Sequence, residues 1–182
     1  AHSLIKARRL PKMSPLEPHV SYHRCWPQDC DIFKEMNNGR ILTLYELGRF
    51  QAAVRMGLWA LLKERKWGLT VAGTSIRYRR RILPFEKYET RTRIATWDER
   101  FVYIEQGMFK RNGECASHAL FRTAVVEKNR AVPTEKLIAA LGITDPRPAP
   151  AARVANWIAA EATRPWPPMQ DAQEVTPLYL AS

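Results

Sequence analysis

The alternation of hydrophobic and polar residues divides the chain into a strand, a long helix and a second group of strands. Residues 19–26 alternate between the two types and are bounded by Pro18 and Pro27, which predicts a strand. Across residues 38–66, apolar side chains recur at steps of three and four, which indicates a helix with a break near Gly57. Apolar residues cover so much of this helix that it must be buried on most sides.

After Gly68 the pattern becomes strand-like and predicts four strands, over residues 71–82, 87–97, 101–110 and 115–127. Short turns connect them, so neighbouring strands must be antiparallel. The pair Asn112-Gly113 is a strong signal for a type I′ hairpin, and Pro133 opens a final short helix over residues 134–141. A curved antiparallel sheet with the long helix lying across it buries that helix best, so we expect an α+β fold.

Proline is concentrated at the C-terminal end of the chain. Seven of the 13 prolines lie in residues 145–182, where their fixed φ and missing N–H discourage regular structure. We therefore predict a basic N-terminal segment (1–15), a domain (16–144) and a Pro-rich C-terminal tail (145–182). Within the tail, residues 153–163 carry apolar side chains at helical spacing, and we expect this short helix to pack back onto the domain.

The composition is that of one globular domain, since 46% of the 182 residues are hydrophobic and 26% are charged. Charged residues interrupt every long apolar stretch, so no membrane span is expected. Three cysteines without a CxxC spacing indicate neither a disulfide framework nor a zinc ribbon. The N-terminus lacks the apolar segment of a secretory signal, and we expect a cytoplasmic protein.

The net charge of +11 arises entirely before the tail, because acidic residues exceed basic ones by one in residues 145–182. A field of this sign attracts anions, which include nucleic acid, an acidic membrane surface and a phosphate-bearing small molecule. Charge alone does not choose among them, and a nucleic-acid-binding function is disfavoured because only Tyr78 supplies an aromatic ring within the basic run.

A polar loop before the long helix carries the candidate chemistry. Asp31 lies seven residues before Asn38, close enough for the loop to fold back over the helix start, where Asn37 or Asn38 is a suitable N-cap. The N–H groups of the first helical turn have no intrahelical partners and can hold an oxyanion. A carboxylate beside them is the minimum equipment for attack on an activated acyl carbon. The alternative is that Asp31 and the asparagines are ordinary loop and capping residues.

A motif around this loop resembles that of a known family. The string Asp31-x-x-x-x-Met36-Asn37-Asn38, followed by Ile41, Leu42, Tyr45, Glu46 and Arg49, is similar to the D-x-x-G-H-(V/M)-N-N motif of 4-hydroxybenzoyl-CoA-thioesterase-like hot-dog proteins. The resemblance covers about residues 18–142 and implies a hot-dog fold, in which a curved antiparallel sheet wraps a long central helix.

The resemblance also implies an activity, that of an acyl-CoA thioesterase. Asp31 would be the nucleophile or general base toward the thioester, and the N–H of Asn38 or Gly39 would polarise its carbonyl. Coenzyme A would enter as part of the substrate, with no separate cofactor. The chain would assemble as a homodimer or a homotetramer.

The sequence departs from the family motif at Lys34 and Glu35, where the family usually has Gly-His. Lysine reaches the positive φ that glycine allows only at a cost, so the loop is expected to be strained or to follow another path. Glu35 either takes over part of the role of the histidine or repels the carboxylate of Asp31. An altered loop favours an alternative function, in which a hot-dog protein binds acyl-CoA or another acyl ligand without cleaving it.

Some further candidates have an equally simple structural interpretation. Glu46 and Arg49 lie three residues apart on the predicted helix, which favours an ion pair over a role for Glu46 at the reacting centre. Asp29 ranks second to Asp31 because its spacing fits the motif less well. Tyr45 indicates an apolar acyl site, as do Phe50 and Trp59, unless these side chains belong to the core.

The basic run Arg77-Tyr78-Arg79-Arg80-Arg81 ends a predicted strand. Alternation places Arg77, Arg79 and Arg81 on one face and Arg80 with Tyr78 on the other. The guanidinium groups form either a charged strand end or a clamp for the phosphates of coenzyme A.

The remaining histidines and cysteines give weak signals. His19 and His23 share a strand face without a third ligand, so no metal site is predicted. His118 is expected to be packed. Cys30 lies between two aspartates, which disfavour the thiolate, so a nucleophilic role is not expected.

Overall fold

The computed structural model describes residues 10–168. The chain forms two compact units, residues 1–149 and 150–182, and each is described by itself. The first unit contains one antiparallel sheet in the order β1-β3-β4-β5-β2, with a short β6 paired to β5. Its strands are β1 (His19–Arg24), β2 (Gly68–Tyr78), β3 (Lys87–Trp97), β4 (Val102–Lys110), β5 (Cys115–Glu127) and β6 (Arg130–Ala131).

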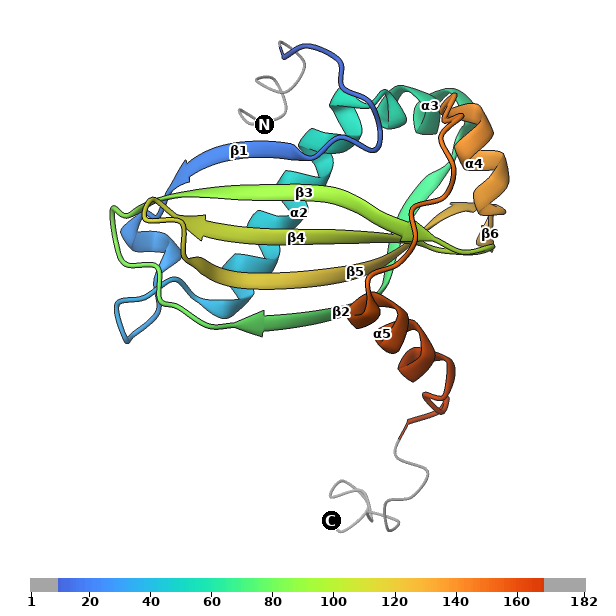
Figure 1. Ribbon diagram of the computed structural model, residues 1–182. Helices are drawn as coiled ribbons and strands as arrows, with labels where there is room; N and C mark the ends of the chain where they lie inside the picture. The colour runs from blue at the N-terminus through green and yellow to red at the C-terminus, as the bar shows by residue number, and fades with distance from the viewer. Residues whose placement is uncertain (1–9, 169–182) are drawn as a thin grey trace, which may run out of the picture. The chain divides into compact units, whose positions relative to one another are not determined.

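The long helix α2 (Asn38–Arg55) lies across one face of this sheet (Figure 1). Its sequence continues into α3 (Leu58–Arg65), and α4 (Thr134–Ala140) follows β6. Gly57 separates α2 from α3 with a φ of +83°, a left-handed conformation that glycine adopts without a steric penalty. The predicted hot-dog fold is confirmed, and so is the break in the helix at Gly57.

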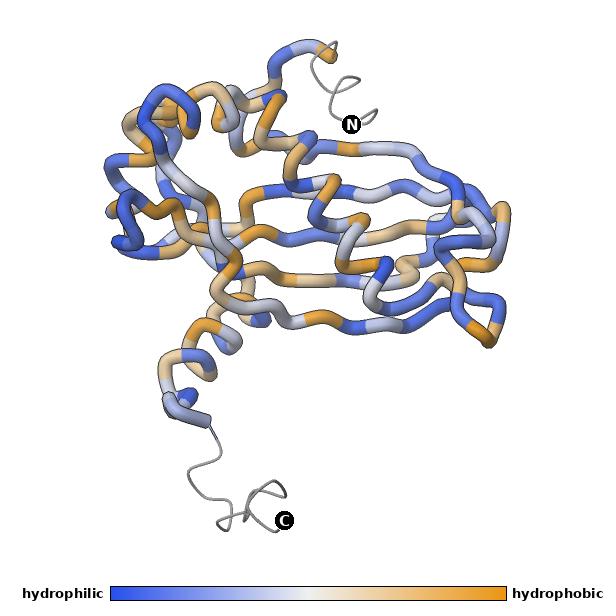
Figure 2. Tube along the Cα trace, turned by 180° about the vertical axis from the view of Figure 1, so that it is seen from behind, coloured by the Kyte–Doolittle hydropathy of each residue, from blue (hydrophilic) through white to orange (hydrophobic). Residues whose placement is uncertain are grey.

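The core lies between α2 and the sheet. Seen from the helix side, apolar residues alternate with polar ones along the strands behind α2 (Figure 2). One buried cluster under α2 includes Ile41, Leu44, Tyr45, Tyr88, Met108 and Phe121. A second cluster, towards α3 and α4, includes Leu62, Trp67, Val102, Val125, Val132 and Leu137. The buried apolar residues of the helix therefore belong to the core, whereas Phe50 and Trp59 are only partly buried and meet edge to face.

Strand β2 differs from its prediction at both ends. It begins at Gly68, which pairs with Val126, and it ends at Tyr78 rather than at residue 82. The backbone N–H groups of Arg79 and Arg80 both donate to the carbonyl of Ala116, at 2.8 and 3.0 Å, so the ladder cannot continue. The predicted alternation of faces through Arg81 is therefore wrong, because Arg79, Arg80 and Arg81 lie in a loop.

The hairpin between β4 and β5 is also not the predicted type. The N–H of Gly113 donates to the carbonyl of Lys110 at 2.9 Å, and the N–H of Lys110 donates to the carbonyl of Glu114 at 2.9 Å. Gly113 has a φ of +86°, whereas Asn112 is not among the residues with positive φ. A type I′ turn needs positive φ at both central residues, so this hairpin has a three-residue loop ending in a left-handed glycine.

The second unit contains the helix α5 (Ala152–Ala162), which confirms the short helix predicted in the tail. Its packing onto the domain stays a prediction, as do the boundaries at residues 15 and 144. The predicted N-terminal segment lies mostly outside the described residues. No helix within residues 10–168 combines the length and the apolar character that a bilayer crossing requires.

Candidate functional site

Asp29 organises the loop between β1 and α2. Its buried carboxylate accepts hydrogen bonds from the backbone N–H of Trp26 at 2.9 Å and from Nε of Arg40 at 2.7 Å. Its backbone carbonyl accepts from the N–H of Asn37 at 2.9 Å. Asp29 thus ties the 3₁₀ turn η1 (Pro27–Asp29) to the first turn of α2, and its carboxylate is fully used by this structural role.

Asp31 lies at the base of a tight turn in the same loop. Its N–H donates to the carbonyl of Glu35 at 2.9 Å, and its carbonyl accepts from the N–H of Lys34 at 3.0 Å. One carboxylate oxygen, Oδ1, accepts from the N–H of Phe33 at 2.9 Å. The second oxygen, Oδ2, has no hydrogen-bond partner among residues 10–168. The side chain is only partly buried, so solvent can reach this oxygen. A carboxylate held in this way is oriented and accessible.

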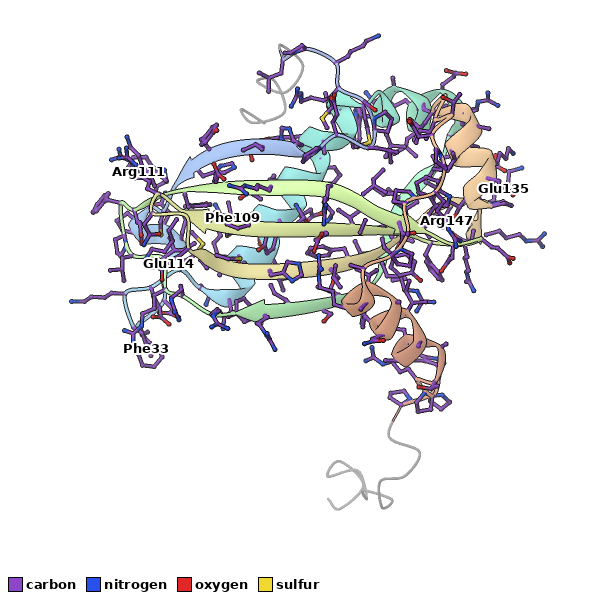
Figure 3. The ribbon with its side chains drawn as sticks, viewed as in Figure 1. Phe33, Phe109, Arg111, Glu114, Glu135 and Arg147 are labelled. Carbon is purple, nitrogen blue, oxygen red and sulfur yellow. The ribbon has the colours of Figure 1, made fainter. Side chains whose placement is uncertain are left out.

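Lys34 adopts a left-handed backbone with a φ of +58°. Of the two expectations for this loop, the value supports strain, because lysine adopts a φ for which glycine is suited. At the tip of the turn, Ile32 and Phe33 are 88% and 73% exposed, respectively. Figure 3 shows Phe33 at the same end of the sheet as Arg111 and Glu114.

The start of α2 is capped by Asn37. Its Oδ1 accepts from the N–H of Gly39 at 2.8 Å and from the N–H of Arg40 at 3.2 Å. The N–H of Gly39 is therefore occupied by the cap. The N–H of Asn38 has no acceptor within residues 10–168, and Asn38 itself is exposed. Of the two donors that the motif suggested, the structure leaves the N–H of Asn38 available to an oxyanion.

Glu35 joins the loop to the segment after β2. Its carboxylate forms an ion pair with Arg81 at 3.1 Å, while Arg80 pairs with Glu114 at 3.2 Å. Arg77 and Arg79 are exposed and have no carboxylate partner within the described part of the chain. Tyr78 donates from its hydroxyl to the carbonyl of Asn38 at 3.3 Å, which brings the end of β2 beside the start of α2.

The predicted ion pair between Glu46 and Arg49 is wrong. Glu46 is exposed, whereas Arg49 donates from Nη1 to Oε1 of Gln106 at 2.8 Å and stacks over the ring of Phe121 at 3.8 Å. Burial lowers the pKa of Arg49 to about 10, with the charge of Glu46 as a smaller opposing influence. Glu46 is exposed to solvent, whereas Arg49 contacts Gln106 and Phe121 of the sheet. These partly buried contacts stabilise Arg49 more than a solvent-exposed ion pair with Glu46 would.

Tyr45 is fully buried in the core. Its hydroxyl donates to the carbonyl of Ser117 at 2.9 Å, and its ring meets Phe121 edge to face. Burial raises its pKa above the usual range. The structure gives Tyr45 a packing role, and its placement in a substrate site stays a prediction.

The histidines also have structural partners. His19 is buried, with Nε2 at 3.1 Å from Oε1 of Gln51 and Nδ1 at 2.9 Å from Nη1 of Arg55, and burial lowers its pKa. His118 is half-exposed and bonds through Nε2 to the buried carboxylate of Glu105 at 2.8 Å. No group of three or more metal-ligating side chains occurs within residues 10–168.

Sequence reasoning missed the contacts that link distant parts of the loop. Arg40 lies eleven residues from Asp29, and Glu35 is far along the chain from Arg81. The partners of each pair lie in different elements or loops, so no period within one helix or strand could predict either contact. Both contacts hold the loop of Asp31 against neighbouring elements.

The fold defines a class of protein: an antiparallel sheet that wraps one long central helix is the hot-dog fold of thioesterase-like proteins. The chain belongs to the thioesterase-like superfamily, whose family model matches residues 25–173. It is similar to Protein THEM6 of Drosophila melanogaster, with 37% identity over 86 residues, or 47% of this chain and 45% of that protein. The chain spans about half the length of the curated relatives it matches.

Two solved structures share the fold. The probable thioesterase YbaW from Escherichia coli has a TM-score of 0.64 and 16% identity, over 67% of this chain and 95% of that chain. The DHNA-CoA thioesterase from Staphylococcus aureus has a TM-score of 0.60 and 14% identity, over 69% of this chain and 89% of that chain. At these identities the similarity shows the fold alone.

Proposed function

We propose that this protein hydrolyses acyl-CoA thioesters and that Asp31 is its catalytic carboxylate. The observation that carries the proposal is that two groups without hydrogen-bond partners within residues 10–168 lie seven residues apart in the sequence. Asp31 presents one carboxylate oxygen without a partner, and the helix that follows begins with the unpartnered N–H of Asn38. Membership of the thioesterase-like superfamily supports the same reaction.

In the proposed reaction, the Asp31 carboxylate accepts a proton from a water molecule as that water attacks the thioester carbonyl. The N–H of Asn38 donates to the oxygen that becomes negatively charged, aided by the positive end of α2. The tetrahedral intermediate then expels the thiolate of coenzyme A and leaves the free acid. Nucleophilic attack by Asp31 itself is the variant of this mechanism that passes through an anhydride.

Binding of the coenzyme A phosphates is assigned to Arg77 and Arg79. Both are exposed at the end of β2, next to the start of α2, and neither is neutralised by a described carboxylate. Arg80 and Arg81 are less suited to this role, because each already pairs with a glutamate. Guanidinium groups match phosphate oxygens in a bidentate fashion.

The test is thiol release from short aliphatic, long aliphatic and aromatic acyl-CoA esters. We expect the native chain to release thiol and Asp31→Asn to lose roughly 100- to 10,000-fold in rate, the range for a missing proton-transfer group. Glu99→Gln is the matched control, because Glu99 is exposed in the turn between β3 and β4, and it should retain the native rate.

Two outcomes would change the assignment. Full activity of Asp31→Asn would show that this carboxylate does not carry the reaction. If the native chain binds acyl-CoA esters by calorimetry but releases no thiol at any pH, the non-catalytic acyl-CoA-binding function replaces the hydrolase.

A further inference from the structure

Two cysteine thiols meet beside the candidate site. Cys25 follows β1 and is fully buried, and Cys30 follows η1 and is partly exposed. Their sulfur atoms lie 3.5 Å apart. The turn η1 brings them together, since the N–H of Cys30 donates to the carbonyl of Pro27 at 3.1 Å. A spacing of five residues matches no redox motif, so this pair could not be predicted from the sequence.

The surrounding backbone fixes Cys25 firmly. Its N–H donates to the carbonyl of Glu86 at 2.9 Å, and its carbonyl accepts from the N–H of Phe85 at 2.7 Å. The backbone of Cys30 pairs with that of Met36, across the loop, as an isolated antiparallel β-bridge. Both sulfur atoms also lie near the carbonyl of Trp26, at 3.8 and 3.6 Å. The two thiols are therefore held side by side by contacts that do not depend on a covalent bond between them.

We propose that Cys25 and Cys30 form a redox modification site, in which a small disulfide such as glutathione disulfide converts the two thiols into an intramolecular disulfide. A sulfur–sulfur bond is about 2.05 Å long, so the sulfur atoms must approach each other by only about 1.5 Å. Cys115 takes no part, because its sulfur bonds to the carbonyl of Ser117 on β5 at 3.3 Å.

The reaction proceeds in two exchange steps. Against the expectation from its two neighbouring aspartates, the partly exposed Cys30 is the first nucleophile, because Cys25 is fully buried. As its thiolate, Cys30 attacks one sulfur of glutathione disulfide, so that a mixed disulfide forms and one glutathione thiolate leaves. Cys25 then loses its proton to solvent and attacks the sulfur of Cys30, which breaks the mixed disulfide and releases the second glutathione. The protein loses two electrons and two protons, and glutathione disulfide is reduced to two glutathione molecules.

The second step is expected to be the slower one. Burial raises the pKa of Cys25 to about 12, and the hydrogen bond with Cys30 and the nearby carboxylates of Asp29 and Glu86 act in the same direction. The attacking thiolate is therefore scarce at neutral pH. The mixed disulfide on Cys30 should accumulate before the ring closes.

Closure of the disulfide constrains the loop between β1 and α2. The residues it encloses include Asp29, which anchors Arg40 and Asn37, and Asp31 follows directly after Cys30. Oxidation therefore constrains the loop that positions Asp31. If Asp31 acts as proposed, the oxidised protein should hydrolyse thioesters at a different rate from the reduced one. This consequence rests on the proposed function, whereas the disulfide itself does not.

The test is the mass and thiol content of the full chain after incubation with glutathione disulfide. Acid quenching followed by alkylation in denaturant should count three thiols in the reduced chain and one in the oxidised chain, with a mass loss of about 2 Da before alkylation. Cys115→Ser should close in the same way, with its two thiols falling to none. Cys25→Ser should stop at a glutathione adduct on Cys30.

Three results would overturn the proposal. They are a native chain that retains three free thiols, a native chain that remains a glutathione adduct at equilibrium, and a Cys25→Ser chain that still loses about 2 Da by pairing Cys30 with Cys115. Because the readout is mass, it needs no substrate. A chain that closes its disulfide but hydrolyses no thioester would contradict the proposed function alone.

Discussion

At the scale of single residues, Lys34 has a backbone conformation that residues with a side chain disfavour. Its left-handed φ of +58° costs a residue with a side chain about 1–2 kcal/mol, and glycine avoids most of this cost. Glycine loses part of the advantage through the entropy of the unfolded chain. We therefore expect Lys34→Gly to raise the free energy of unfolding by about 0.5–1 kcal/mol in urea titrations.

The matched control for this prediction is Lys34→Ala. Alanine also disfavours positive φ, so it should give no gain in stability, while removing the same charge and length of side chain. Equal stabilisation by both variants would show that the lysine side chain, and not its backbone conformation, is the source of the cost.

The same scale shows how far the sequence could anticipate the site. The rules of helix capping were enough to predict a cap at Asn37 or Asn38, and the structure selects Asn37, whereas the role of Asp31 stays a proposal. The pairing of Asp29 with Arg40 and the approach of Cys25 to Cys30 depend on how the loop folds. Arg49 depends on the sheet beneath it, which supplies Gln106 and Phe121 from far along the chain. Tertiary contacts of this kind leave no periodic trace in a sequence.

At the scale of elements, the N-terminus of α2 links stability to the candidate site. The Asn37 side chain satisfies the N–H groups of Gly39 and Arg40, and loss of a cap of this kind costs about 1 kcal/mol. We expect Asn37→Ala to lower the free energy of unfolding by about that amount, and Asn37→Asp to retain most of it because aspartate is an equally good cap. Urea denaturation of the three proteins checks this prediction.

An equal loss in Asn37→Ala and Asn37→Asp would contradict the capping role. It would mean that the amide nitrogen of Asn37 contributes to stability and that its Oδ1 does not.

Element boundaries were predictable where the pattern of side chains alone decides them. The bounds of β3 and β5 agree with the alternation of the sequence. The end of β2 and the hairpin at Gly113 are set instead by backbone hydrogen bonds, in which two N–H groups share the carbonyl of Ala116 and a three-residue loop closes on Lys110. Side-chain patterns carry no information on how backbone donors are shared.

At the scale of the whole molecule, β2 is the most exposed strand of the sheet. It lies at the edge, paired only with β5 along the described part of the chain (Figure 1). Most of its eleven residues are exposed, and Leu69 and Val71 are 38% and 46% exposed. A long edge strand with unpaired N–H and C=O groups and apolar side chains is a template for another strand. The dimer that the family resemblance implies stays a prediction, and we expect its two copies to pair through their β2 edges.

The inferred assembly predicts a measurable mass. Sedimentation at micromolar concentration should give at least twice the chain mass of 21.0 kDa, and Val71→Lys should halve this value, because a lysine on an edge strand blocks pairing with another edge. Tyr22→Lys is the matched control, since Tyr22 is 76% exposed on β1 at the opposite edge of the sheet. A native mass of 21.0 kDa, or a folded Val71→Lys chain that keeps the native mass, would contradict association through β2.

Association through β2 also predicts an effect on activity. Because β2 ends beside the start of α2, a second copy paired there would approach the loop of Asp31. Val71→Lys should therefore also lower any thioester hydrolysis, while the closure of the Cys25–Cys30 disulfide stays unchanged.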